Sequence, residues 1–250
     1  MFQCKMINSL TKVFLDQEPV EEKLDVSILR GETASFQVAV LAYGDVWVTA
    51  AAPGLKVTVR EVEPVPVRYP CLPGLEDDNY LRKTPGLYPD LLTPMDEAGL
   101  SRGGGYWKAF WIDAEPEENT PAGDYEVKVS VKSWDDGKDV FFEGTANVHF
   151  VDCQLPKQKL LLTNWFHPDC LADYYGVQVW SEKHWAIVEN FVRSAVKMGM
   201  NMILTPLFTL ALDTQVGLER TTVQLVDVKK DGGVYSFGFE KFERWVKLCK

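Results

Sequence analysis

Apolar and polar residues alternate with a period of two along several stretches of the first 155 residues. These stretches are 35–41, 55–62, 124–131 and 146–151. The alternation is strictest in 124–131, where Tyr125, Val127, Val129 and Val131 fall on one side. Such a pattern predicts β-strands with one buried face. The Asp-Gly pair within 134–138 provides the positive φ that a tight hairpin turn requires. Together these features predict a β-sandwich domain over residues 1–155.

Proline interrupts this pattern between residues 63 and 105, which hold seven of the chain's 14 prolines. Proline cannot donate a hydrogen bond to a neighbouring strand and is kept out of central strands. We therefore expect a long excursion from the sandwich, of a kind that is often functional or interfacial. Three glycines at 103–105 end this segment, and the Lys-Ser/Thr pair of a phosphate loop does not follow them. They are interpreted as a flexible return to a strand at 106–112.

The pattern changes after the sandwich region. Two largely apolar runs, 159–166 and 201–208, predict parallel strands that are buried on both faces. Apolar residues at helical spacing follow each run, in one helix that begins after Ser181 and in a second that begins near Phe239. Residues 221–239 suggest a small hairpin between the second run and the second helix.

Strands and helices in alternation make βα units. We therefore predict that residues 156–250 form an incomplete (β/α) barrel, the first two βα units of a (β/α)8 barrel. The predicted fold class is multidomain, β plus α/β. The apolar stripe of the second helix continues to Lys250, and four such elements cannot close a sheet. We therefore expect the chain to be a truncated portion of a longer protein.

Charge and composition exclude several classes of partner and site. A formal net charge of −10 argues against nucleic acid and against an anionic membrane surface as partners. No apolar run reaches the length of a membrane span, and no signal peptide is recognisable, so the expected location is cytoplasmic. Five cysteines without a CxxC pair predict no disulfide framework. Three widely spaced histidines predict no metal site, and no cofactor is expected.

Several motifs resemble a known family. The segments NWFH at 164–167 and NMILTPLF at 201–208 are the most specific, and YPDLL at 88–92 and PAGDY at 121–125 agree with them. In these motifs the chain is similar to the uncharacterised domain family 4091, which is related to glycoside hydrolase family 123. The resemblance covers nearly the whole chain and implies an amino-terminal β-sandwich packed on a (β/α)8 barrel.

The resemblance also implies a reaction. Characterised relatives are retaining enzymes that act on β-linked N-acetylgalactosamine, in which the acetamido oxygen of the sugar attacks C1. An Asp-Glu pair on a later barrel strand assists, an exception to the scheme with a carboxylate nucleophile. The adjacent acid pairs of this chain all precede residue 156 and are interpreted as surface or turn residues. We therefore expect no catalytic residue within these 250 residues.

Candidate binding residues stand where the two predicted barrel strands end, because ligands bind at the carboxyl ends of barrel strands. Trp165 offers an aromatic face for a sugar ring, and Asn164, His167 and Thr205 offer hydrogen bonds to hydroxyl groups or to an acetamide. Each could instead fill the top of the barrel. Asp169, in the loop after the first strand, is a weaker candidate, while His149 and His184 are interpreted as structural.

Two functions remain open. In the first, the chain is the amino-terminal part of a glycoside hydrolase-like protein that acts on β-linked N-acetylhexosamine glycans by a substrate-assisted retaining mechanism. Its partners would then be a carbohydrate ligand and the remainder of the barrel domain. In the second, the β-sandwich is a non-catalytic carbohydrate-binding or protein-interaction module attached to an inactive barrel.

Overall fold

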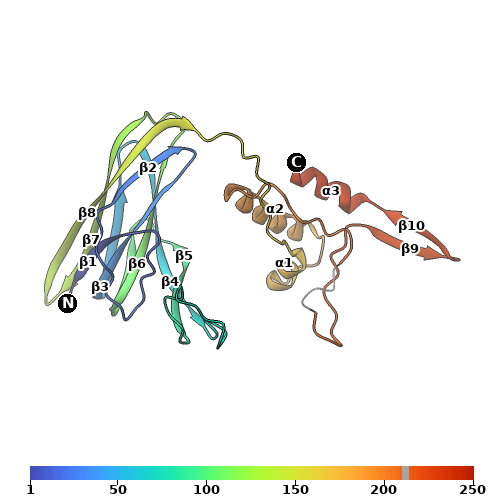
Figure 1. Cartoon of the computed structure of the whole chain (residues 1–250), viewed down its shortest axis with the longest axis horizontal. Coiled ribbons are helices and arrows are strands. Elements are labelled where there is room, and N and C mark those ends of the chain that lie inside the picture. The colour runs from blue at the N-terminus through green and yellow to red at the C-terminus, as the bar shows by residue number, and fades with distance from the viewer. Residues whose placement is uncertain (210–213) are drawn as a thin grey trace. The chain divides into compact units, whose positions relative to one another are not determined.

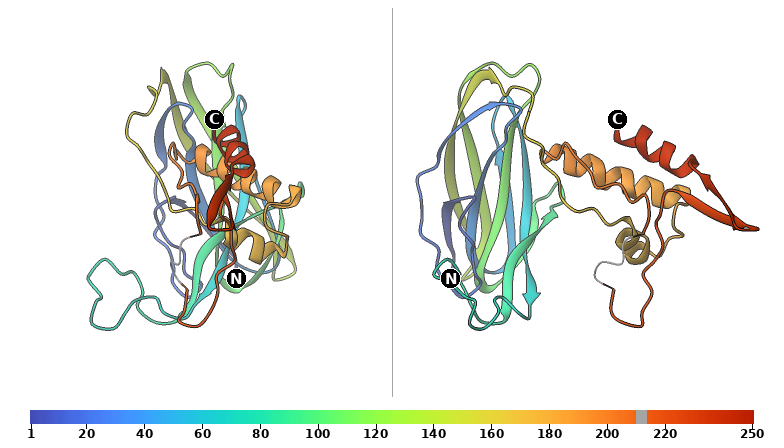
Figure 2. Two further views of the ribbon diagram at one scale, coloured as in Figure 1. Left: turned by 90° about the vertical axis from the view of Figure 1, so that its right-hand side faces the viewer. Right: turned by 45° about the vertical axis from the view of Figure 1, so that its right-hand side comes forward.

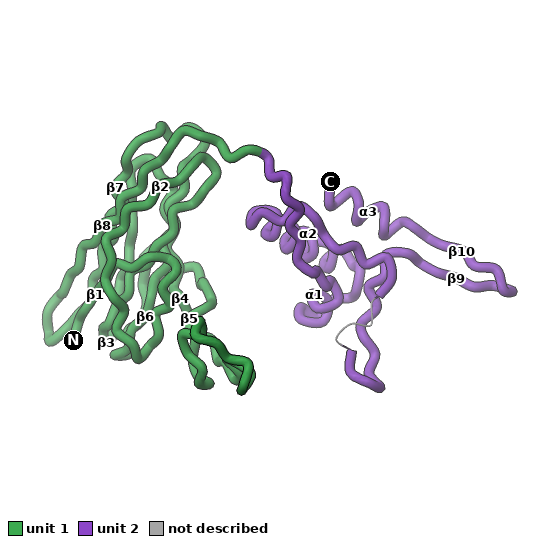
Figure 3. Tube along the Cα trace, viewed as in Figure 1, with its two compact units in different colours: residues 1–156 green, residues 157–250 purple. Residues whose placement is uncertain are grey.

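The computed structural model describes residues 1–209 and 214–250. The chain divides into two compact units, the first from Met1 to Pro156 and the second from Lys157 to Lys250 (Figures 1 and 3). Each unit has its own buried apolar cluster, so each is described by itself.

The first unit is built from eight strands. In chain order they are β1 (Gln3–Asn8), β2 (Asp25–Arg30), β3 (Ala34–Ala51), β4 (Leu55–Val67), β5 (Gly86–Pro94), β6 (Leu100–Pro116), β7 (Gly123–Asp135) and β8 (Lys138–Gln154). The Asp136-Gly137 pair turns β7 into β8, with φ angles of 50° and 76°, as the sequence predicts.

These strands form one sheet, so the expectation of a β-sandwich is wrong. The order β2-β8-β7-β3-β6-β4-β5 is continuous, and β1 pairs with β3 off this path. The 18-residue β3 makes the continuity possible, because its first half pairs with β1 and its second half with β7, while β6 lies along its other side. The pairing of β2 with β8 is parallel, so the sheet is mixed. Figure 2 shows the sheet curling around on itself.

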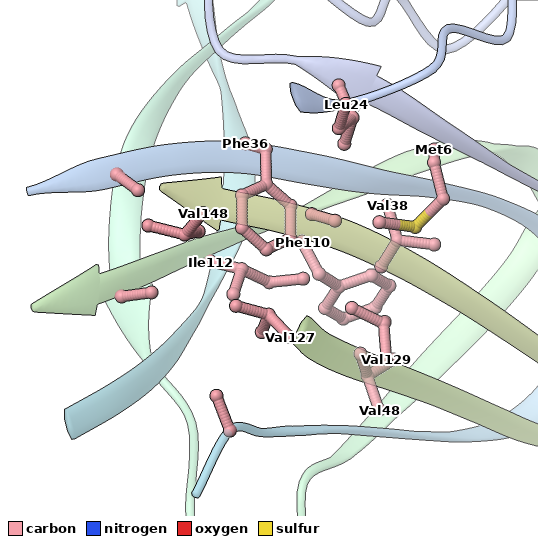
Figure 4. Close-up of a cluster of buried hydrophobic side chains, with 14 of the residues drawn as sticks. Met6, Leu24, Phe36, Val38, Val48, Phe110, Ile112, Val127, Val129 and Val148 are labelled. Atoms are coloured by element: carbon pink, nitrogen blue, oxygen red, sulfur yellow. The ribbon is translucent and has the colours of Figure 1, made fainter. Parts of the chain in front are cut away.

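The curl encloses the apolar core. Alternate residues of strands from around the sheet point inward, and those drawn in Figure 4 include Phe36, Val38, Phe110, Ile112 and Val127. Each of these side chains is at most 1% exposed. The opposite faces of β3 and β6 support a second, smaller cluster around Trp107. A curled single sheet therefore buries the same inward-facing residues that a two-sheet sandwich would bury.

The sequence predicts that the three glycines form a flexible return to a strand. This prediction is wrong, because all three lie inside β6. Gly103 and Gly104 pair with β3, next to a register shift between Leu41 and Tyr43. A Cβ atom at Gly103 would lie 2.4 Å from the backbone oxygen of Ala42. Glycine is required here because two backbones approach closely at a bulge.

The second unit contains α1 (Pro168–Tyr175), α2 (Glu182–Lys197), β9 (Asp227–Asp231), β10 (Val234–Gly238) and α3 (Glu240–Cys249). Ser181 caps α2 as predicted, and its hydroxyl accepts from the backbone N–H of His184. A hairpin is present as predicted, as the antiparallel pair β9–β10, but it covers only 227–238, and the first part of the predicted 221–239 segment lies outside it. None of these helices has the length and apolar character needed to cross a bilayer, within the residues that the structure describes.

Trp185 and Val188 of α2 pack with Trp245 of α3 and with Leu225 in one buried cluster. Arg244 of α3 lies over the Trp185 ring and donates to both carboxylate oxygens of Glu182, at 2.6 and 2.8 Å. This bonding holds the pKa of Glu182 below its ordinary value. The contacts join α3 to the start of α2.

The expectation of two βα units is wrong as well. Residues 159–166 and 201–208 do not form β-strands. They meet at Leu162, whose carbonyl oxygen accepts from the backbone N–H groups of Asn201 and Met202 at 3.1 and 3.2 Å. A parallel ladder needs evenly spaced backbone bonds along the whole pair. Here the backbone bonds are confined to Leu162, and the further bonds to Leu160 and Leu162 come from the Asn201 side chain.

Further along, the second apolar run has a different neighbour. The backbone oxygens of Pro206 and Leu207 accept from the N–H groups of Leu225 and Val226, at 3.0 and 3.2 Å. The first run is left largely uncovered, and Leu160 is 78% exposed. An apolar run therefore indicated a segment suited to burial, but it did not determine the neighbour or the backbone pairing.

Candidate functional site

The start of α1 carries two of the polar groups of the site. His167 is the N-cap residue, Pro168 follows at the first helical position, and Asp169 lies in the first turn. Proline suits this position because its φ is already helical and no N–H group is needed there. Asp169 is only 4% exposed, although a carboxylate is almost never buried unless it is paired.

Arg220 provides the pairing group from a distant loop. Its Nε and Nη2 atoms donate to the two carboxylate oxygens of Asp169, and the Nη2–Oδ1 distance is 3.0 Å. Nη2 also lies 2.8 Å from Nδ1 of His167. A guanidinium can only donate, so Nδ1 of neutral His167 must accept and the ring proton must be on Nε2. One arginine thus fixes both the carboxylate and the imidazole.

The loop that carries Arg220 is itself held in place. The Thr221 hydroxyl donates to Asp173 of α1 at 2.8 Å, and the Val223 N–H donates to the Thr209 hydroxyl at 2.9 Å. Val223 is also buried. These bonds attach the loop to α1 on one side and to residues 204–209 on the other. The position of the guanidinium is therefore set by several contacts besides its own ion pair.

A pocket of about 260 Å³ opens beside this cluster. Its polar lining includes His167, Asp169, Thr205 and Arg220, and much of the rest is apolar, including Phe166 and Phe208. A second hollow of about 420 Å³ shares His167, Asp169 and Arg220 with the first and has a more polar lining. The three residues thus stand where the two hollows meet.

The four predicted binding residues are not all brought together. His167 and Thr205 line the same pocket. Trp165 and Asn164 do not line either hollow, but the Trp165 ring meets the His167 ring edge to face, with centroids 6.3 Å apart. Trp165 is 69% exposed, so its aromatic face is available at the surface next to the pocket.

Arg220 is the residue that the sequence reasoning missed. It lies 51 positions from Asp169 in a polar stretch without periodicity. The sequence places Asp169 in a loop as a weaker candidate, whereas in the structure it is a buried helical residue at the centre of the cluster. The local signal was a carboxylate directly after a proline, and it needs a cationic partner only when it is buried, as Asp169 is in the structure.

The arrangement suits the binding of a polar ligand with an apolar face. The pocket offers an imidazole, a hydroxyl, a guanidinium and two aromatic side chains in a small volume. Within residues 1–209 and 214–250, no group of three or more His, Cys, Asp or Glu side chains is placed to hold a metal ion. Asp169 is occupied by Arg220.

Comparison with known proteins shows where the chain has relatives. Residues 165–250 match the family described as glycoside hydrolase 123, catalytic domain. The chain also resembles the solved structure of a family 123 glycoside hydrolase from Clostridium perfringens, reported with the details of glycolipid glycan hydrolysis. The TM-score is 0.77 and the identity 13%, over 99% of this chain and 45% of that chain. The second unit is therefore glycoside hydrolase-like in sequence, and the chain shares the fold of part of that enzyme.

Other comparisons add little. The PapD-like domain 7 of human CEP192 matches at a TM-score of 0.27 and 11% identity, over 53% of this chain and 84% of that domain. A score this low carries no argument. No curated protein matches the sequence.

Proposed function

We propose that this chain belongs to a glycoside hydrolase-like protein and that the pocket beside His167, Thr205 and Arg220 binds a sugar. One observation carries the proposal: the pocket lies within the part of the chain that matches a glycoside hydrolase catalytic domain. For the whole protein, we propose action on β-linked N-acetylhexosamine glycans by a substrate-assisted retaining mechanism. The chain spans about 45% of the length of the family 123 enzyme that it resembles, so that activity is a proposal.

The chemistry of the lining supports a sugar as the ligand. Hydroxyl and acetamide groups need fixed donors and acceptors, which His167 Nε2–H and the Thr205 hydroxyl provide. The C–H faces of a pyranose pack on aromatic rings, and Phe166 and Phe208 line the same space. Trp165 adds a further exposed ring beside His167, and Asn164 precedes it with an amide that can donate and accept.

The proposed role of these residues is to bind and orient the sugar. Substrate assistance needs one acid that orients the acetamide and another that protonates the leaving oxygen. Asp169 is the acidic residue that lines the smaller pocket, and both of its oxygens accept from Arg220. We therefore expect binding of a sugar by the 250-residue chain without cleavage of an aryl N-acetyl-β-galactosaminide.

The test is saturation-transfer NMR with methyl N-acetyl-β-galactosaminide and the 250-residue chain. His167→Ala and Thr205→Val should each weaken the transfer signal. His149→Ala is the matched control, because His149 lies in β8 of the other unit and is bonded to Asp124. If the wild-type chain gives no signal, or if His167→Ala and His149→Ala behave alike, the sugar assignment of the pocket is wrong.

Trp165 needs a separate control because removal of any exposed tryptophan changes the surface. Trp134 is 57% exposed, close to the 69% of Trp165, and lies in β7 of the sheet unit. Trp165→Ala should reduce sugar binding, and Trp134→Ala should not. Equal binding by both variants would remove Trp165 from the proposed site.

A further inference from the structure

His184 is a fully buried histidine that the site described above does not include. It lies in the first turn of α2, and its side chain is 0% exposed. The backbone N–H of Trp180 donates to its Nδ1 atom at 3.0 Å. Its Nε2 atom lies 2.9 Å from the backbone oxygen of Pro168.

These two partners determine the tautomer. A backbone N–H can only donate, so Nδ1 must carry a lone pair, and a carbonyl oxygen can only accept, so Nε2 must carry the proton. His184 is therefore a neutral ring with a donor at one end and an acceptor at the other. No other protonation state of the ring satisfies both partners.

The two partners belong to segments that matter for the site. Pro168 lies between His167 and Asp169, which both contact Arg220. Trp180 has a φ of 57°, a conformation that a bulky residue adopts only when its surroundings enforce it. Its ring packs on His184 and Trp185, with centroid distances of 5.1 and 4.6 Å. The turn before α2 is thus fixed, and His184 connects it to the first residue of α1.

We infer that His184 is a positioning residue for the pocket: its donated bond to Pro168 holds the start of α1 so that His167 and Asp169 meet Arg220. The inference rests on the proposed function only for the identity of the ligand. The effect of His184 on the position of His167 can be measured in the ligand-free chain and does not depend on that function.

Two variants separate the two bonds. Asparagine places its side-chain oxygen near the position of Nδ1 but does not reach Pro168, whereas glutamine places an N–H near the position of Nε2. His184→Asn should therefore keep the Trp180 bond and lose the Pro168 bond, and His184→Gln should keep the Pro168 bond. Thermal melts of both variants measure how much stability each has lost.

The first readout is NMR of ¹⁵N-histidine-labelled, ligand-free chain, which contains three histidines. In the wild type, the ring nitrogen shifts of His184 and His167 should both report the Nε2–H tautomer. His184→Gln should leave the His167 signals unchanged, and His184→Asn should move them towards an average of the two tautomers. The second readout is binding of methyl N-acetyl-β-galactosaminide, which should be about fivefold weaker in His184→Asn than in His184→Gln, the ratio expected when one net hydrogen bond is lost.

The outcomes are distinct. If both variants leave His167 unchanged, or if both disturb it equally, His184 acts by packing alone and the inference is overturned. If a variant does not fold, the wild-type spectrum still tests the inference. A His184 ring that is charged or carries its proton on Nδ1 could not make both bonds, and the inference would be overturned. If the His167 signals follow the expected pattern but no sugar binds to the wild type, the positioning role stands and the proposed function fails.

Discussion

Removal of the Asp169 carboxylate should destabilise the second unit strongly. The Asp169 side chain is 5% exposed and that of Arg220 is 14% exposed. At the 3.0 Å separation of Nη2 and Oδ1, two unit charges attract by about 1.4 kcal/mol in water and by about 5 kcal/mol at the effective dielectric constant of a protein. The low exposure places this pair near the second value. Asp169→Ala also removes this carboxylate from a nearly buried guanidinium, and breaking a buried ion pair from one side costs about 3–5 kcal/mol.

The pair is best measured by a double-mutant cycle. Asp169→Leu and Arg220→Met should each cost several kcal/mol, whereas the double variant should lose much less, because apolar side chains of similar size need no counter-charge. We expect a coupling energy of about 2–3 kcal/mol. The assay is urea unfolding, monitored by hydrogen exchange and mass spectrometry of peptides from 157–250. Reading the exchange peptide by peptide measures the unfolding of the second unit apart from that of the sheet.

The refuting result is additivity. If the double variant loses the sum of the two single losses, the ion pair contributes nothing beyond the packing of its parts. Peptides from β3 are the internal control, since β3 belongs to the first unit and the pair to the second. A change in their exchange would show that the variants act through global unfolding, and the cycle would then be measured at lower urea.

Three further predictions concern the sheet unit. Phe36→Ala should lower the free energy of unfolding by about 3–5 kcal/mol in urea titration, since the side chain is 0% exposed in the main core. Gly103→Ala should lower the melting temperature, because the new methyl group would lie 2.4 Å from the backbone oxygen of Ala42. Burial raises the pKa of Cys4 to about 12, so iodoacetamide at pH 8 should label it far more slowly than exposed Cys153. The contribution of this raised pKa to the stability of the fold is fully present below pH 9. It is lost as the pH rises towards 12, because the thiol of the unfolded chain ionises first.

Local features of the fold were predictable because their causes are local. Ser181 precedes an apolar stripe at helical spacing, and a side-chain cap depends on residues within one turn. The Asp136-Gly137 turn follows from the backbone freedom of two residues. Each prediction needed only the neighbouring sequence, and each is confirmed by the structure.

Strand partners were not predictable in the same way. Alternation shows that Phe36 and Val127 each need a buried face, but it does not show whether that face belongs to a second sheet or to the same sheet curled around. The deciding feature is the length of β3, which exceeds the 35–41 stretch and takes β1 and β7 in succession. Period-2 patterning fixes the side to which a residue points and leaves the neighbour undetermined.

The position of Arg220 illustrates what elimination could have added. Asp169 follows a proline in a mostly apolar setting, so a buried carboxylate with a cationic partner was a reasonable hypothesis. The second unit contains three arginines. Arg193 lies four residues after Glu189 on a helix and pairs with it, and Arg244 lies in α3 and pairs with Glu182 at the start of α2. The remaining arginine is Arg220, whose loop shows no helical or strand period that would otherwise account for it. The lysines of the unit could also supply a cation, so elimination narrows the choice of partner for Asp169 without identifying it, and the 51-residue separation leaves no mark in either local pattern.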